Sequence, residues 1–211
     1  MNTAGENGMS ATREKYFDQN GLYDENEEFL LIEPNDTYKD AYFDLCKETY
    51  VMKDKLDDEE YRRLGWGILF KVGIVLFVIE KGTNNLCGYV ELKHIDSEHP
   101  EIGIELFKKY QRQGIGYKAI KLMLSKAQQI HPVSSYKIRI YYDNISSQKL
   151  FEKLGAVKVG EEEGKMTQFM REAKEVLSGK ALDDFTRVYK ELTEAEPNAV
   201  YVYDLAANDI G

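Results

Sequence analysis

The segment IELFKKYQRQGIGYKAIKLMLSKAQ combines glycines and basic residues at the point where a strand pattern gives way to a helix pattern. Gly114 and Gly116 let the backbone approach a ligand closely and adopt torsion angles that side chains disfavour. The first amides of a helix have no partner within the helix, and the helix dipole attracts anions to them. Lys108, Lys109 and Arg112 add positive charge within an otherwise acidic chain. The segment therefore predicts a binding site for a phosphate group.

Two other interpretations of this segment stay open. The glycines could serve only a tight, solvated turn. The run from Gly114 to Ala119 also fits the loose pattern G-x-G-x-x-A of nucleotide-binding oxidoreductases. That pattern needs its first glycine almost directly after a strand, whereas six residues (KKYQRQ) separate Phe107 from Gly114. The P-loop pattern G-x-x-x-x-G-K-[ST] does not occur in the sequence.

Three stretches follow one another in a recognisable order. EIGI at 101–104 fits a central strand, QRQGIG at 111–116 has the form Q/R-x-x-G-x-G/A, and NISSQKLFEKLG at 144–155 is close to N-x-x-A-x-x-x-Y-x-K-x-G-F. In type, order and spacing they resemble the signatures of the Gcn5-related N-acetyltransferase (GNAT) family. The resemblance covers about residues 86–159, and the remainder of the chain agrees with it only in general arrangement.

The resemblance implies that acetyl-CoA is the co-substrate and that the glycine-rich turn holds its diphosphate. The pantetheine arm would lie along Leu106 and Phe107, where strands at 101–107 and 136–142 splay apart. Asn144 resembles the family residue that contacts the CoA arm, although a helix N-cap alone would explain an asparagine there. The residues of the turn that would take part are Gln111, Arg112, Gln113, Gly114, Ile115, Gly116 and Tyr117.

The resemblance also implies direct transfer of the acetyl group to an amine. A base must first deprotonate the ammonium form, because protonated amines do not attack a thioester. The amide of Leu106 or Phe107 would stabilise the negative charge that develops on the carbonyl oxygen. Glu101 lies at the position of the family's glutamate base, and Glu105 on the same strand face or Glu91 on the neighbouring strand could substitute. Each carboxylate could equally be an ordinary solvated or paired side chain.

One position departs from the family pattern. The tyrosine that can protonate the leaving thiolate corresponds to Phe151, which has no proton to donate but would still lie at the CoA site. Water, Tyr141 or Tyr142 could supply that proton. The departure favours an alternative function, a non-catalytic CoA-binding or regulatory module. Glu101 and Glu105 favour an enzyme that acetylates a primary amine of a small molecule, a peptide or a protein.

Hydrophobic patterns predict one α+β domain at 26–211, and the polar segment at 1–25 before it is expected to be a flexible arm or a lightly docked turn. By resemblance, the sheet is mostly antiparallel with one splayed parallel pair and has helices on both faces. Two amphipathic helices at 166–193 form an insertion before the last strand, and could be a lid over the acceptor, a dimer surface or a cover for the core. Strands are expected at 28–33, 73–80, 86–95, 101–107, 136–142, 156–160 and 199–205, and helices from Asp36 and at 57–64, 114–128 and 145–154.

Composition excludes several other classes of protein. The 211 residues include 28 basic and 37 acidic side chains, and the net charge of −9 argues against nucleic-acid binding and weakly favours a cationic acceptor. We expect neither a membrane span nor a signal peptide, because no long apolar run occurs and the N-terminus is polar. Two distant cysteines and three histidines without ligand spacing predict reduced thiols, a cytoplasmic location and no metal. A homodimer is compatible with the sequence.

Overall fold

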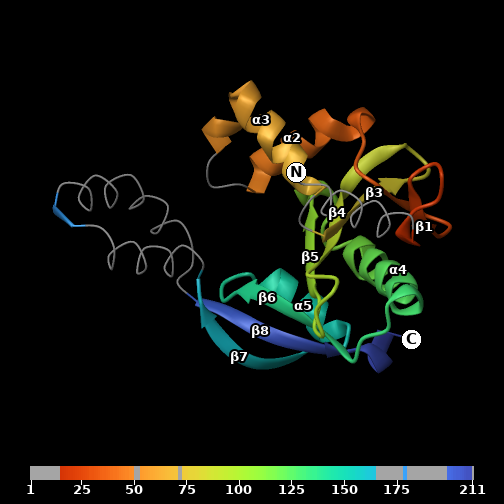
Figure 1. The fold of residues 1–211 in the computed structure, drawn as a ribbon, viewed down its shortest axis with the longest axis vertical. Helices are drawn as coiled ribbons and strands as arrows, with labels where there is room; N and C mark the ends of the chain where they lie inside the picture. The colour runs from red at the N-terminus through yellow and green to blue at the C-terminus, as the bar shows by residue number, and fades with distance from the viewer. Residues whose placement is uncertain (1–14, 50–52, 71–72, 165–177, 180–198, 211) are drawn as a thin grey trace, which may run out of the picture. The chain divides into compact units, whose positions relative to one another are not determined.

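The chain forms two compact units, one comprising Met1–Tyr136 with Ala206–Gly211 and the other Lys137–Leu205. The structure, a computed structural model, describes residues 15–49, 53–70, 73–164, 178–179 and 199–210 (Figure 1). The chain contains both helices and β-strands, so the fold is of the mixed α/β class that the sequence predicts.

Five strands of the first unit form a continuous antiparallel sheet, in which each strand pairs with the next along the chain. The central strand is continuously apolar (GIVLFVIE) and has six consecutive buried residues, because both of its faces are covered. The strands are β1 (Leu22–Glu25), β2 (Phe29–Ile32), β3 (Gly73–Glu80), β4 (Asn85–Lys93) and β5 (Glu101–Leu106).

Helices cover this sheet on its two sides (Figure 1). On one side, Tyr42 and Trp66 pack against Phe77, and Tyr42 also contacts Tyr89. On the other side lies α4, which buries a stripe of seven residues at helical spacing. The helices of the first unit are α2 (Lys39–Thr49), α3 (Glu59–Leu69) and α4 (Ile115–Ile130), with 3₁₀ turns η1 (Asp36–Tyr38), η2 (Lys53–Asp57), η3 (Lys108–Tyr110) and η4 (Ala207–Ile210).

The segment before β2 packs against α4. Tyr16 is 4% exposed and Tyr23 is 1% exposed, and the Tyr23 hydroxyl donates a hydrogen bond to the carbonyl oxygen of Met123 on α4 at 2.7 Å. Residues 15–25 thus dock on α4 and contribute β1. The free energy gained by burying two aromatic rings is sufficient to order a segment whose other residues are mostly polar.

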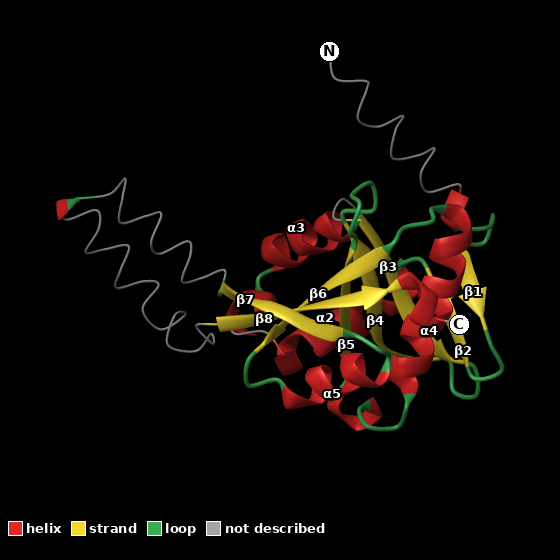
Figure 2. Ribbon diagram, turned by 90° about the horizontal axis from the view of Figure 1, so that it is seen from below, coloured by secondary structure: helices red, strands yellow, loops and turns green. Residues whose placement is uncertain are grey.

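The second unit contains α5 (Ile145–Lys153), β7 (Val157–Glu163) and all but the end residues of β6 (Ser135–Tyr141) and β8 (Ala199–Ala206), which Figure 2 shows. Strand β8 pairs antiparallel with β7, and its other neighbour is β6. The splayed parallel pair expected from 101–107 and 136–142 would join the two units and stays a prediction. The helical insertion expected at 166–193 lies outside the described residues, apart from 178 and 179.

Most of the predicted elements are confirmed where the structure describes them. Strand β3 has the predicted bounds, and the ends of α4, α5 and β5 differ from prediction by one or two residues. Among the described residues, no helix is both long enough and apolar enough to cross a lipid bilayer.

Candidate functional site

The glycine-rich turn starts α4 without a side-chain cap. Gly114 is the N-cap residue and has left-handed torsion angles (φ 82°, ψ −4°), and Arg112 also has a positive φ of 60°. The first hydrogen bond within the helix runs from the Lys118 N–H to the Gly114 carbonyl oxygen at 3.1 Å. The amides of Ile115 and Gly116 precede that bond and have no acceptor within the helix. Left-handed residues next to a helix start form a concave set of amides that suits an anion.

The turn is held in place by its own glutamine side chains. Gln111 Nε2 donates to the Leu106 carbonyl oxygen at 2.9 Å, and Gln113 Nε2 donates to that of Lys109 at 2.6 Å. Gln111, which the sequence places in the CoA-binding motif, thus connects the turn to the end of β5. The Lys109 ammonium lies 4.8 Å from the centre of the Tyr110 ring. These contacts fix the backbone without using the first amides of α4.

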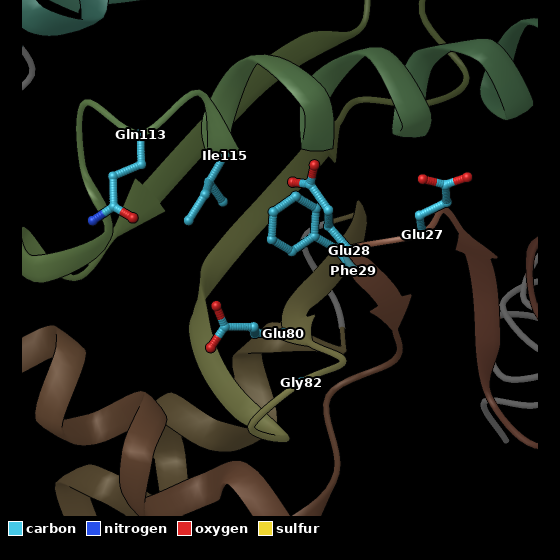
Figure 3. A pocket seen from close by; sticks show the side chains of 7 residues that line it. All are labelled: Glu27, Glu28, Phe29, Glu80, Gly82, Gln113 and Ile115. Atoms are coloured by element: carbon cyan, nitrogen blue, oxygen red, sulfur yellow. The ribbon is translucent and has the colours of Figure 1, made fainter.

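A cavity of about 340 Å³ adjoins the turn on the side of β2 and β3 (Figure 3). Three carboxylates contribute to its wall, and one of them, Glu28, forms an ion pair with Lys118 of α4. Carboxylates repel phosphate oxygens, so this cavity is unsuited to a diphosphate. The lining residues are Glu27, Glu28, Phe29, Glu80, Gly82, Gln113 and Ile115.

The end of β5 distinguishes the two amides that could stabilise a carbonyl oxygen. The Phe107 N–H donates to the Cys87 carbonyl oxygen on β4 at 3.1 Å, so it is already engaged. Leu106, the residue before Phe107, is paired with Gly88 in the antiparallel register. N–H groups alternate between the two edges of a strand, so the Leu106 N–H points away from β4. Leu106, rather than Phe107, offers the candidate donor.

The candidate bases lie on one face of the sheet. Glu101 is paired with Lys93, Gly103 with Glu91, and Glu105 with Tyr89, as the sequence predicts for alternating residues. A side chain at position 103 would overlap the Glu91 carboxylate, so glycine there provides the space that Glu91 occupies.

Charges around Glu101 and Glu105 differ. The Lys93 ammonium lies 4.0 Å from the Glu101 carboxylate and 2.8 Å from that of Glu91. Burial raises the pKa of Glu105, and the negative charges of Glu48 and Glu91 raise it further, to about 7. A carboxylate with a pKa near 7 is well matched to accepting a proton near neutral pH. The raised pKa makes Glu105 a stronger candidate for the base than its position on the strand alone does.

Glu48 is a contributor that the sequence analysis missed. The residue lies near the end of α2, and its Oε2 atom accepts a hydrogen bond from the Lys108 N–H at 3.0 Å. The two residues are 60 positions apart, so no local pattern links them.

Two candidate residues lie in the second unit. Asn144 is the N-cap of α5, and its side chain accepts from the Ser147 N–H at 3.1 Å, as capping predicts. Phe151 is 2% exposed, whereas Tyr142 is 48% exposed. Contacts of Asn144 and Phe151 with acetyl-CoA stay predictions.

Comparison with known proteins places the chain in a family. The acetyltransferase (GNAT) domain model matches residues 29–157, which is more than half of the chain, so the protein belongs to the GNAT family of acetyltransferases. The family uses acetyl-CoA as co-substrate. A search of curated proteins finds no match.

Solved structures of the family share the fold. A GNAT-family acetyltransferase from Bacillus anthracis is 19% identical, with a TM-score of 0.62, and the match covers 87% of this chain and 98% of that one. A mutant of the spermidine N-acetyltransferase SpeG from Vibrio cholerae is 15% identical, with a TM-score of 0.61 and coverage of 88% and 97%. A GNAT-family acetyltransferase described as putative, from Bordetella pertussis, is 12% identical, with a TM-score of 0.58 and coverage of 86% and 98%.

The structure brings no metal-ligand cluster together in the part of the chain that it describes. Cys46 is half-buried and Cys87 is buried, and both are free thiols.

Proposed function

We propose that the protein transfers the acetyl group of acetyl-CoA directly to a primary amine of a small molecule, a peptide or a protein. The observation that carries the proposal is the start of α4, where the left-handed torsion angles and the missing side-chain cap leave the first amides without an acceptor from the helix or from a cap. The amides of Ile115 and Gly116 would hold the diphosphate, and the positive charge of Arg112 supports them. When bound, acetyl-CoA supplies the thioester.

Glu105 is the proposed general base. It accepts a proton from the ammonium form of the acceptor, and its pKa of about 7 allows it to do so without being fully protonated at neutral pH. The Leu106 N–H, which points to the edge of β5 away from β4, would donate to the carbonyl oxygen as negative charge develops. Both groups belong to adjacent residues of β5, so the strand keeps them near each other.

The experiment measures thiol release from acetyl-CoA with a panel of amines that includes spermidine, simple diamines and peptides. Spermidine belongs in the panel because the SpeG neighbours act on it, and the net charge of −9 supports a cationic acceptor. With a reactive amine, the wild-type kcat/KM should rise with pH through an acidic limb near 7.

Glu105→Gln should lower kcat/KM by about a hundredfold and abolish that acidic limb, because general bases contribute rate factors of about 10² to 10⁴. Glu101→Gln is the matched variant on the same strand face and should change the rate less than about tenfold. A large loss in Glu101→Gln with an unchanged Glu105→Gln would assign the base to Glu101.

Stability provides the control for folding. The Glu105 pKa rises from 4.5 to about 7 in the folded protein, so the folded state binds more protons than the unfolded state between those values. The free energy of unfolding therefore falls as the pH rises through this window. Glu105→Gln cannot titrate at this position and does not show this loss. The stability of Glu105→Gln relative to the wild type should therefore be higher above about pH 7 than it is near pH 4. A loss of activity in that variant would then not reflect unfolding.

A non-catalytic CoA-binding module is the second candidate, and the buried Phe151 in place of a proton-donating tyrosine favours it. Acetyl-CoA binding without thiol release for any amine would support it. A cytoplasmic location stays a prediction that the two free cysteines support.

A further inference from the structure

The end of α2 contacts the backbone at the start of the proposed acetyl-CoA turn. The Lys108 N–H donates to Glu48 Oε2 at 3.0 Å, and Lys108 is the first residue of η3, which leads into the glycine-rich motif. Gln111, the residue after η3, returns a hydrogen bond to the Leu106 carbonyl oxygen. The turn is therefore fixed at two points, once to α2 and once to β5.

The same carboxylate adds negative charge beside Glu105. The groups that interact with Glu105 come from two elements: Glu48 and Cys46 from α2, and Glu91 and Tyr89 from β4. Glu91 is neutralised in part by Lys93 at 2.8 Å. The hydrogen bond that Glu48 accepts from Lys108 comes from a neutral backbone amide, which does not cancel a negative charge.

Helix stability does not explain a glutamate at position 48. Glu48 precedes the last residue of α2, where the helix dipole favours cations and disfavours anions. Lys47 meets the dipole preference at this end and also forms an ion pair with Asp57 at 2.7 Å. The hydrogen bond from the Lys108 N–H offsets the unfavourable interaction of Glu48 with the helix dipole.

We propose that Glu48 is a positioning residue, which anchors the start of the acetyl-CoA turn to α2 and places a negative charge next to Glu105. The inference rests on the proposed function, because it assigns the turn to acetyl-CoA and Glu105 to proton transfer. One carboxylate thereby links the placement of the co-substrate to the protonation state of the base.

Two substitutions of Glu48 separate the hydrogen bond from the charge. Glu48→Gln keeps an oxygen that can accept from the Lys108 N–H but removes the charge, so the Glu105 carboxyl should titrate at lower pH while acetyl-CoA affinity is retained. Glu48→Ala removes both, so it should show the same titration shift and also bind acetyl-CoA about fivefold more weakly, the effect of one hydrogen bond. Asp44→Asn is the control, because it removes an exposed charge one turn earlier on α2.

A second pair of variants tests the hydrogen bond from its donor side. Lys108→Pro removes the N–H, and proline suits the first position of a helical turn. Phe107 has torsion angles (φ −50°, ψ 141°) that a following proline accepts. Lys108→Ala loses the same positive charge but keeps the N–H. Lys108→Pro should bind acetyl-CoA about fivefold more weakly than Lys108→Ala, and adding Glu48→Ala to Lys108→Pro should cause no further loss.

Calorimetry measures acetyl-CoA affinity, and ¹³C NMR follows the Glu105 carboxyl, whose signal Glu105→Gln identifies by its disappearance. The role of Glu48 is overturned if Glu105 titrates at the same pH in Glu48→Gln as in the wild type. It is also overturned if Lys108→Pro and Lys108→Ala bind equally. A wild-type protein that binds no acetyl-CoA would instead remove the proposed function, and the NMR titration would still test the charge of Glu48.

Discussion

The two helices that follow the sequence motifs begin in different ways. α5 begins after Asn144, whose side chain accepts a hydrogen bond from the Ser147 N–H. α4 begins after Gly114, which has no side chain and adopts left-handed torsion angles. A cap satisfies a helix amide and stabilises the helix, whereas a missing cap leaves the amide to another partner.

Differences in length and burial show how α4 tolerates a missing cap. α4 has 16 residues and buries seven, including Ile120, Met123 and Leu124, whereas α5 has nine residues and buries Phe151. Packing of an apolar face contributes more to helix stability than a cap does. The helix that is anchored by its core contacts is thus the one whose first amides remain for a ligand.

The largest expected effect is at Gly114. Gly114→Glu should weaken acetyl-CoA binding by at least about a hundredfold, because it places a negative charge beside the proposed diphosphate site. An added Cβ meets no atom within 4 Å, so the space around the Cβ position does not oppose the substitution. Thermal shift with acetyl-CoA measures the loss, since a ligand that binds only the folded state raises the Tm.

Backbone strain at Gly114 needs its own control, because φ is 82° there. Gly114→Asn adds no charge, and asparagine tolerates left-handed torsion angles better than most residues. It should retain far more affinity than Gly114→Glu. Equal losses in both variants would attribute the effect to strain, and undiminished affinity in Gly114→Glu would refute the assigned site.

An intermediate effect is expected at Gln111, which supports the turn that α4 leaves uncapped. Gln111→Ala removes the 2.9 Å hydrogen bond to the Leu106 carbonyl oxygen and should weaken acetyl-CoA binding about fivefold. Calorimetry checks the affinity. Gln113→Ala, which removes the contact to Lys109, is the comparison within the same turn, and an unchanged affinity in Gln111→Ala would remove its supporting role.

The smallest expected effect on acetyl-CoA binding is at Asn144. Asn144→Ala removes the cap of α5 and should lower the free energy of unfolding by about 1 kcal/mol. Asn144→Ser restores a capping oxygen and should recover most of that stability. Chemical denaturation measures the stability of both variants. Loss of acetyl-CoA affinity in Asn144→Ser at normal stability would add a direct contact with the CoA arm to the capping role.

Local patterns in the sequence predict most elements of the fold. The apolar run of β3 and the helical spacing along α4 are explicit in the residues themselves, so their bounds agree closely with prediction. Strand β1 (LYDE) was missed because its composition is polar. What orders it is a contact of Tyr23 with Met123, which is 100 residues away in sequence.

Within the candidate site, the turn could be predicted but the choice of base could not. Glycine spacing and basic residues point to the start of α4 directly. Glu101 and Glu105 lie on the same face of β5, so the alternation of side chains does not distinguish them. They differ in their neighbours, which are Lys93 on β4 for Glu101 and Glu48 on α2 for Glu105. Such contacts depend on register and helix placement, which no sequence window contains.

Gly103 has a consequence for how this protein can diverge. A methyl group there would overlap the Glu91 side chain, so that side chain would have to move to another position. A larger residue at 103 would therefore displace the Glu91 carboxylate and alter the charge neighbouring Glu105. A substitution at a position that carries no reacting group would thus change the acidity of the proposed base.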